Sequence, residues 1–320
     1  MGVCFMAGID LTDAFVSETL VAMQDHWKQS NWIRNLGASN IGEDCPRKIW
    51  LTWRYAKMPD FPPRILRLFD RGHREEPTLV AELKSAGVNV YGEQEDIIGY
   101  KKHFMAHPDG RAMGILEAPK TEHLLEFKTA SDAKFIEMVG KGCKAANPGY
   151  YRQMQIQMHL TGLTRAFFLM VNKNDDHIYA ERIPYDKAEG ERLQELIEFI
   201  IDTSKPPEKC ESYKCNWCAM KGLCEGTDTP ELNCRTCVFS EPVTGGHWHC
   251  SKHDDNIPKE FQLKGCDKHL LIPGIIEAHP IDTDEKTFIE YDNGLLNFNA
   301  EYVTTDKVNP EHTLTWGVPF

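Results

Sequence analysis

The stretch LLEFKTA, residues 124–130, places a carboxylate and an ammonium inside an apolar run. Side chains alternate across a β-strand, so Glu126 and Lys128 project to one side and Phe127 projects to the other, toward the expected core. An ion pair on an exposed face is the ordinary explanation for two such charges, and this heptapeptide alone favours it. A second interpretation depends on what lies nearby.

The sequence around this strand alternates between helical and strand periodicity, which predicts an α/β fold with a mixed sheet. Helices are expected over 11–30, 39–56, 62–85 (with a break near Gly72), 131–140, 148–162 and 186–203. Strands are expected over 88–94, 97–110, 123–130, 165–173 and 177–185, and short strands beyond 275. Residues 204–209, SKPPEK, are typical of a linker. We therefore expect a first domain over 1–229 and an acidic second domain over 230–320.

Upstream of the strand, the sequence HPDGRA holds Asp109 in a Pro-Asp-Gly corner. Aspartate is common in such turns, and taken alone this one would be a turn residue. Together with Glu126 and Lys128, however, it forms the pattern PD…ExK on adjacent strands. Two carboxylates can share Mg²⁺ or Mn²⁺, and a lysine beside them can orient or help to deprotonate a water molecule and offset phosphate charge. The pattern predicts hydrolysis of a phosphodiester.

From about Pro62 to Tyr185 the chain resembles the PD-(D/E)xK nuclease superfamily, in its lambda-type and RecB-like exonuclease branches. The resemblance implies a core of αβββαβ order and a metal site that includes Glu76, in RGHREEP, and the main-chain carbonyl of Phe127. His73 lies on about the same helical face as Glu76, and we interpret it as a surface histidine.

The same resemblance extends to YYRQMQIQMHLTG, residues 150–162. It implies that Gln153, on the helix after the catalytic strand, orients Lys128 or the phosphate. Gln155 shares the Tyr-x-x-Gln-x-Gln texture of the lambda-type enzymes. RecB-like nucleases carry tyrosine where this chain has Gln157, so no role is assigned to that residue.

Cysteines form a second prominent feature, with 11 in the chain and most of them after residue 209. The segment CNWCAMKGLC places Cys215, Cys218 and Cys224 at spacings that suit zinc or an iron–sulfur cluster equally. With Cys45, in a Cys-Pro sequence before the core, they resemble the pattern of AddB and the CRISPR-associated RecB-like exonucleases. That resemblance implies a 4Fe–4S cluster that staples the two ends of the core. A zinc site that uses Cys210 is the alternative.

A further group is typical of a small zinc-ribbon-like module. Its members are Cys234, Cys237, Cys250 and Cys266. The segment between them is short and polar, so a bound Zn²⁺ would have to supply its stability. Its acidic surroundings make it a poor surface for DNA, and we expect it to face a recombination or repair protein or another copy of this chain, as a homo-oligomer.

Bulk properties limit the classes of function. The net charge of −12 argues weakly against nucleic acid, but residues 230–320 carry most of the excess, so a basic groove in the first part remains compatible with it. No apolar run suits a membrane span and no secretory signal opens the chain, so we expect a soluble cytoplasmic protein of a bacterial or phage-infected cell.

These features together predict a metal-dependent DNA exonuclease that acts in recombination or DNA-end processing. Two alternatives stay open. One is a catalytically silent nuclease fold that binds DNA or recruits partners, against which the intact Asp, Glu and Lys set argues. The other is a redox or regulatory iron–sulfur protein, which would leave the PD…ExK pattern unexplained.

Overall fold

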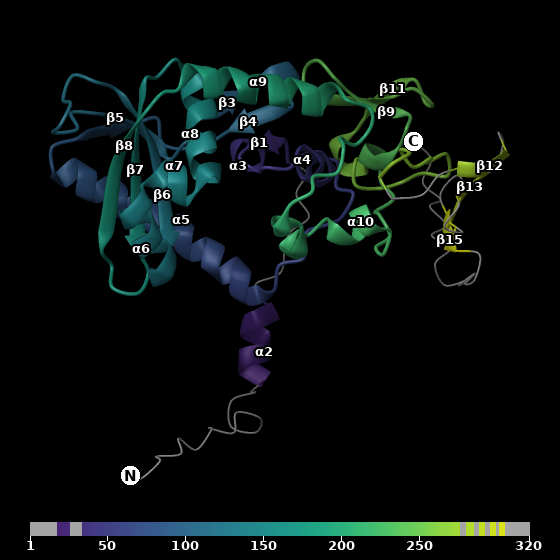
Figure 1. Ribbon diagram of the computed structural model, residues 1–320, viewed down its shortest axis with the longest axis horizontal. Coiled ribbons are helices and arrows are strands. Elements are labelled where there is room, and N and C mark those ends of the chain that lie inside the picture. The colour runs from purple at the N-terminus through teal and green to yellow at the C-terminus, as the bar shows by residue number, and fades with distance from the viewer. Residues whose placement is uncertain are drawn as a thin grey trace, which may run out of the picture.

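The computed structural model describes residues 18–25, 34–275, 280–284, 288–291, 295–298 and 301–304 (Figure 1). Its main sheet has five strands in the order β2-β5-β6-β7-β8. The strands are β2 (Asn89–Tyr91), β5 (Gly110–Met113), β6 (His123–Ala130), β7 (Arg165–Asn172) and β8 (Ile178–Pro184). β6 and β7 run parallel and the other pairs are antiparallel, so the mixed sheet predicted from the sequence is confirmed.

The parallel pair requires a crossover, which three helices supply. They are α6 (Asp132–Lys141), α7 (Cys143–Ala146) and α8 (Pro148–Thr161). α8 begins where the Asn147 side chain accepts a hydrogen bond from the N–H of Tyr150 and Pro148 occupies the first turn. The crossover therefore places α8 against one face of β6. This is the face toward which every second side chain of β6 points.

Two layers of helix cover the two faces of this sheet. On one face Leu124 packs with Met154 and Met158 of α8. On the other, Phe127 packs with Leu79 of α5 (Pro63–Ser85). α5 runs along the sheet as one long helix (Figure 1), continuous through Gly72 and Pro77, so the expected break near Gly72 is wrong. Phe127 points into the core, as the alternation of the strand predicted.

Two other segments differ from expectation. The expected helix over 39–56 is divided into α3 (Ala38–Ile41) and α4 (Pro46–Trp53), because Pro46 lacks the N–H that a continuing helix needs and begins a new one instead. The expected strand over 97–110 is broken at Lys101 and Lys102, whose φ angles of 50° and 61° are incompatible with a strand.

The pieces of that broken strand join a separate small sheet. They are β3 (Ile97–Ile98), the 3₁₀ turn η1 (Tyr100–Lys102) and β4 (Phe104–Ala106), and the sheet has the order β1-β4-β3 with β1 (Leu36–Gly37). Of the expected helix over 11–30, the structure describes α2 (Glu18–Asp25), and the rest lies outside the described residues.

The remaining elements follow β8 along the chain. They are α9 (Lys187–Asp202), η2 (Tyr213–Trp217), α10 (Lys221–Glu225), η3 (Cys234–Thr236), β9 (Ser240–Val243), β10 (His247–Cys250), β11 (Asp255–Ile257) and η4 (Lys259–Phe261). A four-stranded antiparallel sheet comprises β12 (Pro280–Asp284), β13 (Phe288–Tyr291), β14 (Leu295–Phe298) and β15 (Glu301–Thr304). The expected short strands beyond 275 are thus present, while the Asn-Gly turn falls outside the described residues.

A second hydrophobic core joins the start of the chain to its later part. Trp50 of α4 and Ile197 of α9 belong to the same buried cluster as Trp248 of β10 and Leu271. Trp50 also donates a hydrogen bond to the carbonyl of Thr203 at 3.1 Å. The segment from 230 to 275 therefore packs directly on the elements that precede the five-stranded sheet.

Within the part of the chain that the structure describes, no helix combines the length and the apolar character that crossing a bilayer would need.

Candidate active site

The Pro-Asp-Gly corner lies beside β6, the strand that carries Glu126 and Lys128. β5 pairs with β6 so that Gly110 faces Leu125, and the N–H of Asp109 donates to the carbonyl of Leu125 at 3.2 Å. The Asp109 carboxylate in turn accepts a hydrogen bond from the N–H of Phe127 at 2.5 Å. The structure thus brings Asp109 next to the ExK sequence, although sixteen residues separate it from Glu126.

Glu126 is the buried centre of the site, with 1% of its surface exposed. Its Oε1 accepts a hydrogen bond of 2.7 Å from Nε2 of Gln153, on α8. The ammonium of Lys128 contacts the same oxygen. Oε2 is buried and has no hydrogen-bond partner among the described residues. One carboxylate oxygen is therefore held by two donors, and the other is desolvated and available.

The neighbours of Lys128 keep its ammonium group protonated. Its Nζ lies 5.3 Å from the centre of the Tyr150 ring, within range of a cation–π interaction. Burial disfavours the charged ammonium, but the carboxylates of Glu126 and Asp109 outweigh it and raise the pKa of Lys128 above its ordinary value. Lys128 therefore donates hydrogen bonds at neutral pH and has no lone pair with which to accept a proton.

Asp109 shows the opposite electrostatic effect. Burial, and after it the nearby Glu126 carboxylate, raises the pKa of Asp109 to about 8. Lys128 and the N–H of Phe127 act in the other direction and Glu76 adds to the increase, but the sum still favours the neutral acid. Two neighbouring carboxyl groups that are partly buried repel each other when both are ionised. Ionisation of both is therefore unfavourable unless they share a cation.

Glu76 reaches the edge of this site from α5. Its Oε1 lies 3.2 Å from Nδ1 of His73, and its Oε2 accepts a hydrogen bond of 3.0 Å from Nε2 of Gln94. His73 is largely solvent-exposed, with 76% of its side-chain surface accessible, which agrees with the surface histidine that its position predicted. Glu76 is close enough to influence the pKa of Asp109, while both its oxygens are engaged elsewhere.

The other two glutamines of α8 form no hydrogen bond with Glu126 among the described residues. Gln155 donates to the carbonyl of Pro184 at 3.0 Å and accepts from the N–H of Asp186 at 2.7 Å, so it ties α8 to the end of β8. Gln157 is fully buried, and its side-chain amide has no partner among the described residues. Of the three glutamines, Gln153 is the one in contact with the site.

The donors at this site fit a hard divalent cation. Mg²⁺ and Mn²⁺ take oxygen ligands, and the unpartnered Oε2 of Glu126 beside the Asp109 carboxylate is such an arrangement. Across the described ranges, however, no three His, Cys, Asp or Glu side chains are drawn together at the spacing of a metal site. A third oxygen ligand from Glu76 would require its carboxylate to leave His73 and Gln94.

The first cysteine group is brought together only in part. Cys45 precedes α4, and its side chain lies within hydrogen-bonding reach of Cys210. The sulfur of Cys210 is 3.7 Å from that of Cys215. Hydrogen bonding to Cys45, together with burial and Cys215, raises the pKa of the Cys210 thiol to about 12. Residues before and after the core therefore meet at this point, with Cys210 between them.

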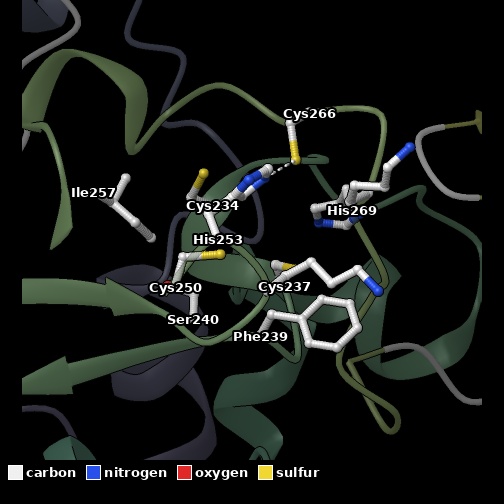
Figure 2. A pocket seen from close by; sticks show the side chains of 11 residues that line it. Cys234, Cys237, Phe239, Ser240, Cys250, His253, Ile257, Cys266 and His269 are labelled. Atoms are coloured by element: carbon white, nitrogen blue, oxygen red, sulfur yellow. Dashed lines mark hydrogen bonds between the residues drawn. The ribbon is translucent and has the colours of Figure 1, made fainter. Parts of the chain in front are cut away.

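Cys218 and Cys224, the other two predicted cluster ligands, lie partly buried against the second hydrophobic core. Among the described residues, neither the predicted cluster ligands nor the alternative set that uses Cys210 is gathered into a metal-binding group. The second group differs: Cys234, Cys237, Cys250 and Cys266 all line one small cavity (Figure 2).

Comparison with known families locates the site within a recognised domain. Residues 57–164 match the model of the YqaJ-like viral recombinase domain. This span contains Glu76, Asp109, Glu126, Lys128 and Gln153, and none of the cysteines predicted to bind metal. The segment in which the sequence predicted a nuclease core is thus similar to a viral recombinase domain. No curated protein gives a significant match to the chain.

Three solved structures match the chain at low identity and low TM-score. The structure of LHK-Exo in complex with dAMP is 20% identical, with 52% of this chain and 86% of that chain covered and a TM-score of 0.40. The alkaline exonuclease LHK-Exo from Laribacter hongkongensis also matches at 20% identity, with 56% and 90% covered and a TM-score of 0.38. A third structure is 15% identical, with 66% and 95% covered and a TM-score of 0.40.

Two contacts of the site escape sequence reasoning. The sequence marks Tyr150 only as part of a motif, yet its ring lies beside Lys128 because it is one helical turn from Gln153. Gln94 occupies a turn with a φ of 56° and holds Glu76 across 18 residues of sequence. No local periodicity signals a contact of that kind.

Proposed function

We propose that this protein is a metal-dependent DNA exonuclease that acts in recombination or DNA-end processing. The observation that carries the proposal is Glu126: a buried carboxylate with one oxygen held by Gln153 and Lys128 and the other unpartnered, beside Asp109. A buried carboxylate with a purely structural role would have its second oxygen satisfied by hydrogen bonds as well. The match of residues 57–164 to a viral recombinase domain supports the same chemistry.

Each residue has a distinct part in the proposed reaction. Asp109 and Glu126 would hold Mg²⁺ or Mn²⁺, with the carbonyl of Phe127 and the Glu76 carboxylate completing the site. When bound, the cation would neutralise charge on the scissile phosphate and make a water molecule easier to deprotonate. Lys128, kept protonated by Glu126 and Asp109, would position that water and stabilise negative charge on the phosphate.

Gln153 would act on Glu126 rather than on DNA. It is buried on α8, and its amide donates to the same oxygen that Lys128 contacts. This fixes the orientation of the carboxylate, so that Oε2 and not Oε1 is presented to a cation. Partners that orient a metal ligand in this way are typically worth a factor of about 10 to 100 in affinity or activity.

The test is cleavage of end-labelled DNA by the full chain in Mg²⁺, in Mn²⁺ and in EDTA. Lys128→Ala should lower the rate by a factor on the order of 10² to 10⁴, with DNA binding retained. Lys141→Ala is the matched control, because the Lys141 side chain is 59% exposed and pairs with Glu137, away from the site. Cleavage by Lys128→Ala within a few-fold of the parent would overturn the nuclease proposal. Binding without cleavage by the parent chain would instead support the catalytically silent alternative.

We further propose that Cys45, Cys215, Cys218 and Cys224 bind a 4Fe–4S cluster, by resemblance to AddB. The approach of Cys45 to the segment that contains Cys215 supports a staple between the ends of the core. Anaerobically purified protein should be brown and lose its colour in Cys45→Ala. A colourless chain that loses zinc in Cys210→Ala would favour the zinc alternative. Residues 230–320 would carry contacts with a recombination or repair protein or with another copy of the chain.

A further inference from the structure

Four cysteines from three separate segments face one cavity in the C-terminal part of the chain. Cys234 and Cys237 flank the turn η3, Cys250 ends β10, and Cys266 follows η4. Figure 2 shows the four cysteines around this cavity, although among the described residues their side chains are not at the spacing of a bound ion. The cavity has a volume of about 20 Å³, which leaves room for a single ion and not for an organic ligand.

Backbone amides point at these sulfurs. The N–H of Leu270 donates to the Sγ of Cys237 at 3.5 Å, and the N–H of Phe239 donates to the same sulfur. The N–H of Lys268 donates to Cys266. Hydrogen bonds of this type are strongest when the acceptor carries a negative charge. These amides favour the thiolate, the form of cysteine that binds metal, and so oppose burial, which raises the pKa of Cys237 to about 11.

Two buried guanidinium groups lie near these cysteines, and Arg54 interacts electrostatically with Cys237. Arg235 sits between Cys234 and Cys237 in the chain, and Arg54 donates to the carbonyl of Arg235 at 3.0 Å. Arg235 is 2% exposed and Arg54 is 1% exposed, and both stack on the ring of Trp248. Neither guanidinium forms an ion pair with a carboxylate within the described ranges, since their hydrogen bonds go to carbonyls and to Gln262.

Buried positive charges are costly unless a negative charge balances them. Four thiolates around one Zn²⁺ carry a net charge of minus two, which the two guanidinium groups would neutralise. We propose that these four cysteines bind one Zn²⁺ and that Arg54 and Arg235 supply the balancing charge. The proposal concerns a site separate from Glu126, and it does not depend on the nuclease function.

The histidines nearby are not needed as ligands. Nε2 of His253 lies 3.7 Å from the sulfur of Cys266, a distance that suits a hydrogen bond to a thiolate. Nε2 of His269 lies 3.3 Å from the hydroxyl of Thr236. Four sulfur ligands close the coordination of zinc and leave no open position, so the ion stabilises structure and takes no part in catalysis.

The site would fasten the C-terminal segment to the rest of the chain. Arg54 extends from the end of α4, and Arg235 donates to the carbonyl of Trp53 at 2.9 Å, so the metal-binding turn and α4 are held together directly. Trp248, one strand position from His249 and two from Cys250, belongs to the core that includes Trp50. Truncation before residue 230 would open this core, so single substitutions are the sharper test.

The experiment measures the metal content of the full chain purified from zinc-supplemented medium. We expect one zinc per chain in the parent and none at this site in Cys250→Ala. Cys143→Ala is the matched control, because Cys143 lies buried in a different cluster, beneath α8. Cys218→Ala should also keep this zinc, and so should His253→Ala. Equal zinc in Cys250→Ala and the parent would overturn the proposal, as would iron in its place.

A second measurement decides the matter if Cys250→Ala fails to fold. The Cys218→Ala chain, in which the first cysteine group is broken, is titrated with an organomercurial while a colour indicator follows released zinc. Release of one zinc as the thiols react is the expected result. A folded Cys218→Ala chain that contains and binds no zinc would overturn the proposal.

Discussion

Gln153 donates a 2.7 Å hydrogen bond to the oxygen of Glu126 that Lys128 also contacts. Glu126 is on β6 and Gln153 is on α8, 27 residues later in the chain. The bond therefore depends on the crossover that returns α8 over β6. Because both donors take Oε1, the other oxygen of the buried carboxylate keeps its capacity for a cation. Gln153 is a positioning residue for the proposed metal site.

Replacing Gln153 by Ala should lower cleavage by a factor of about 10 to 100, because Glu126 loses the donor that fixes its orientation. The deficit should shrink at high Mn²⁺ concentration, since the defect lies in presentation of the carboxylate and not in a missing catalytic group. Titration of the cleavage rate with Mg²⁺ and Mn²⁺ measures both effects. Gln194→Ala on α9 is the control, where the side chain pairs with Glu198. A rate loss that is the same at every metal concentration would argue for a different role.

Much of the arrangement of the candidate site could be predicted from the sequence, because its residues follow local rules. Strand alternation puts Glu126 and Lys128 on one face, and a Pro-Asp-Gly corner places Asp109 at the start of the paired strand. The family resemblance added Gln153, whose position relies on tertiary structure. Gln94 and the meeting of Cys45 with Cys210 were not predictable in the same way. Each joins segments that no periodicity relates, and their contacts arise only once the core is assembled.

The same reason explains where the fold departs from expectation. Helix periodicity predicts one helix over 39–56, but Pro46 begins a second helix within it. The composition of 97–110 is typical of a strand and gives no sign that Lys101 and Lys102 adopt left-handed backbone angles. Hydrophobic patterns also identify Trp248 only as an apolar residue in a polar segment. That it completes a core with Trp50 follows from the packing of distant elements, which a single sequence does not specify.

The raised pKa of Asp109 predicts how metal-free stability depends on pH. An acid whose folded pKa is about 8, against 3.8 ordinarily, binds its proton more tightly in the folded state. The raised pKa therefore leaves the free energy of unfolding unchanged below about pH 4. Between about pH 4 and pH 8 it lowers the free energy of unfolding progressively, because the unfolded state loses this proton first. Asp109→Asn should remove this decrease, and so raise the denaturation midpoint in EDTA by an amount that increases over the same interval.

Chemical denaturation in EDTA at several pH values measures that difference. With Mg²⁺ or Mn²⁺ present the order should reverse, because the cation binds the ionised parent and not the amide. Binding should also release protons near neutral pH, which calorimetry in buffers of different ionisation enthalpy detects. A parent and Asp109→Asn with parallel pH profiles in EDTA would contradict the argument.

Substitutions of Glu76 and His73 should have clearly different effects on the Mg²⁺ concentration that cleavage requires. Glu76→Gln removes the charge that would complete the cation site and should raise the Mg²⁺ concentration needed for half-maximal cleavage by about 10-fold or more. His73→Ala should change it little, because His73 is exposed and contacts one oxygen of the Glu76 carboxylate. Both are measured in the same metal titration. Equal effects of the two substitutions would mean that the pair acts as a unit.

Trp248 provides the test of whether the segment after residue 230 is part of one cooperative unit. Its side chain is 1% exposed, packs in the core that includes Trp50, and stacks on two guanidinium groups. Trp248→Ala should reduce the free energy of unfolding by about 3–5 kcal/mol, the range for loss of a large buried aromatic. Trp217→Ala is the matched control: Trp217 is 79% exposed, and its loss should cost within about 0.5 kcal/mol. Denaturant unfolding followed by circular dichroism gives both values. If Trp248→Ala unfolded in two separate steps with the nuclease-like sheet unaffected, the second core would be energetically independent of the first.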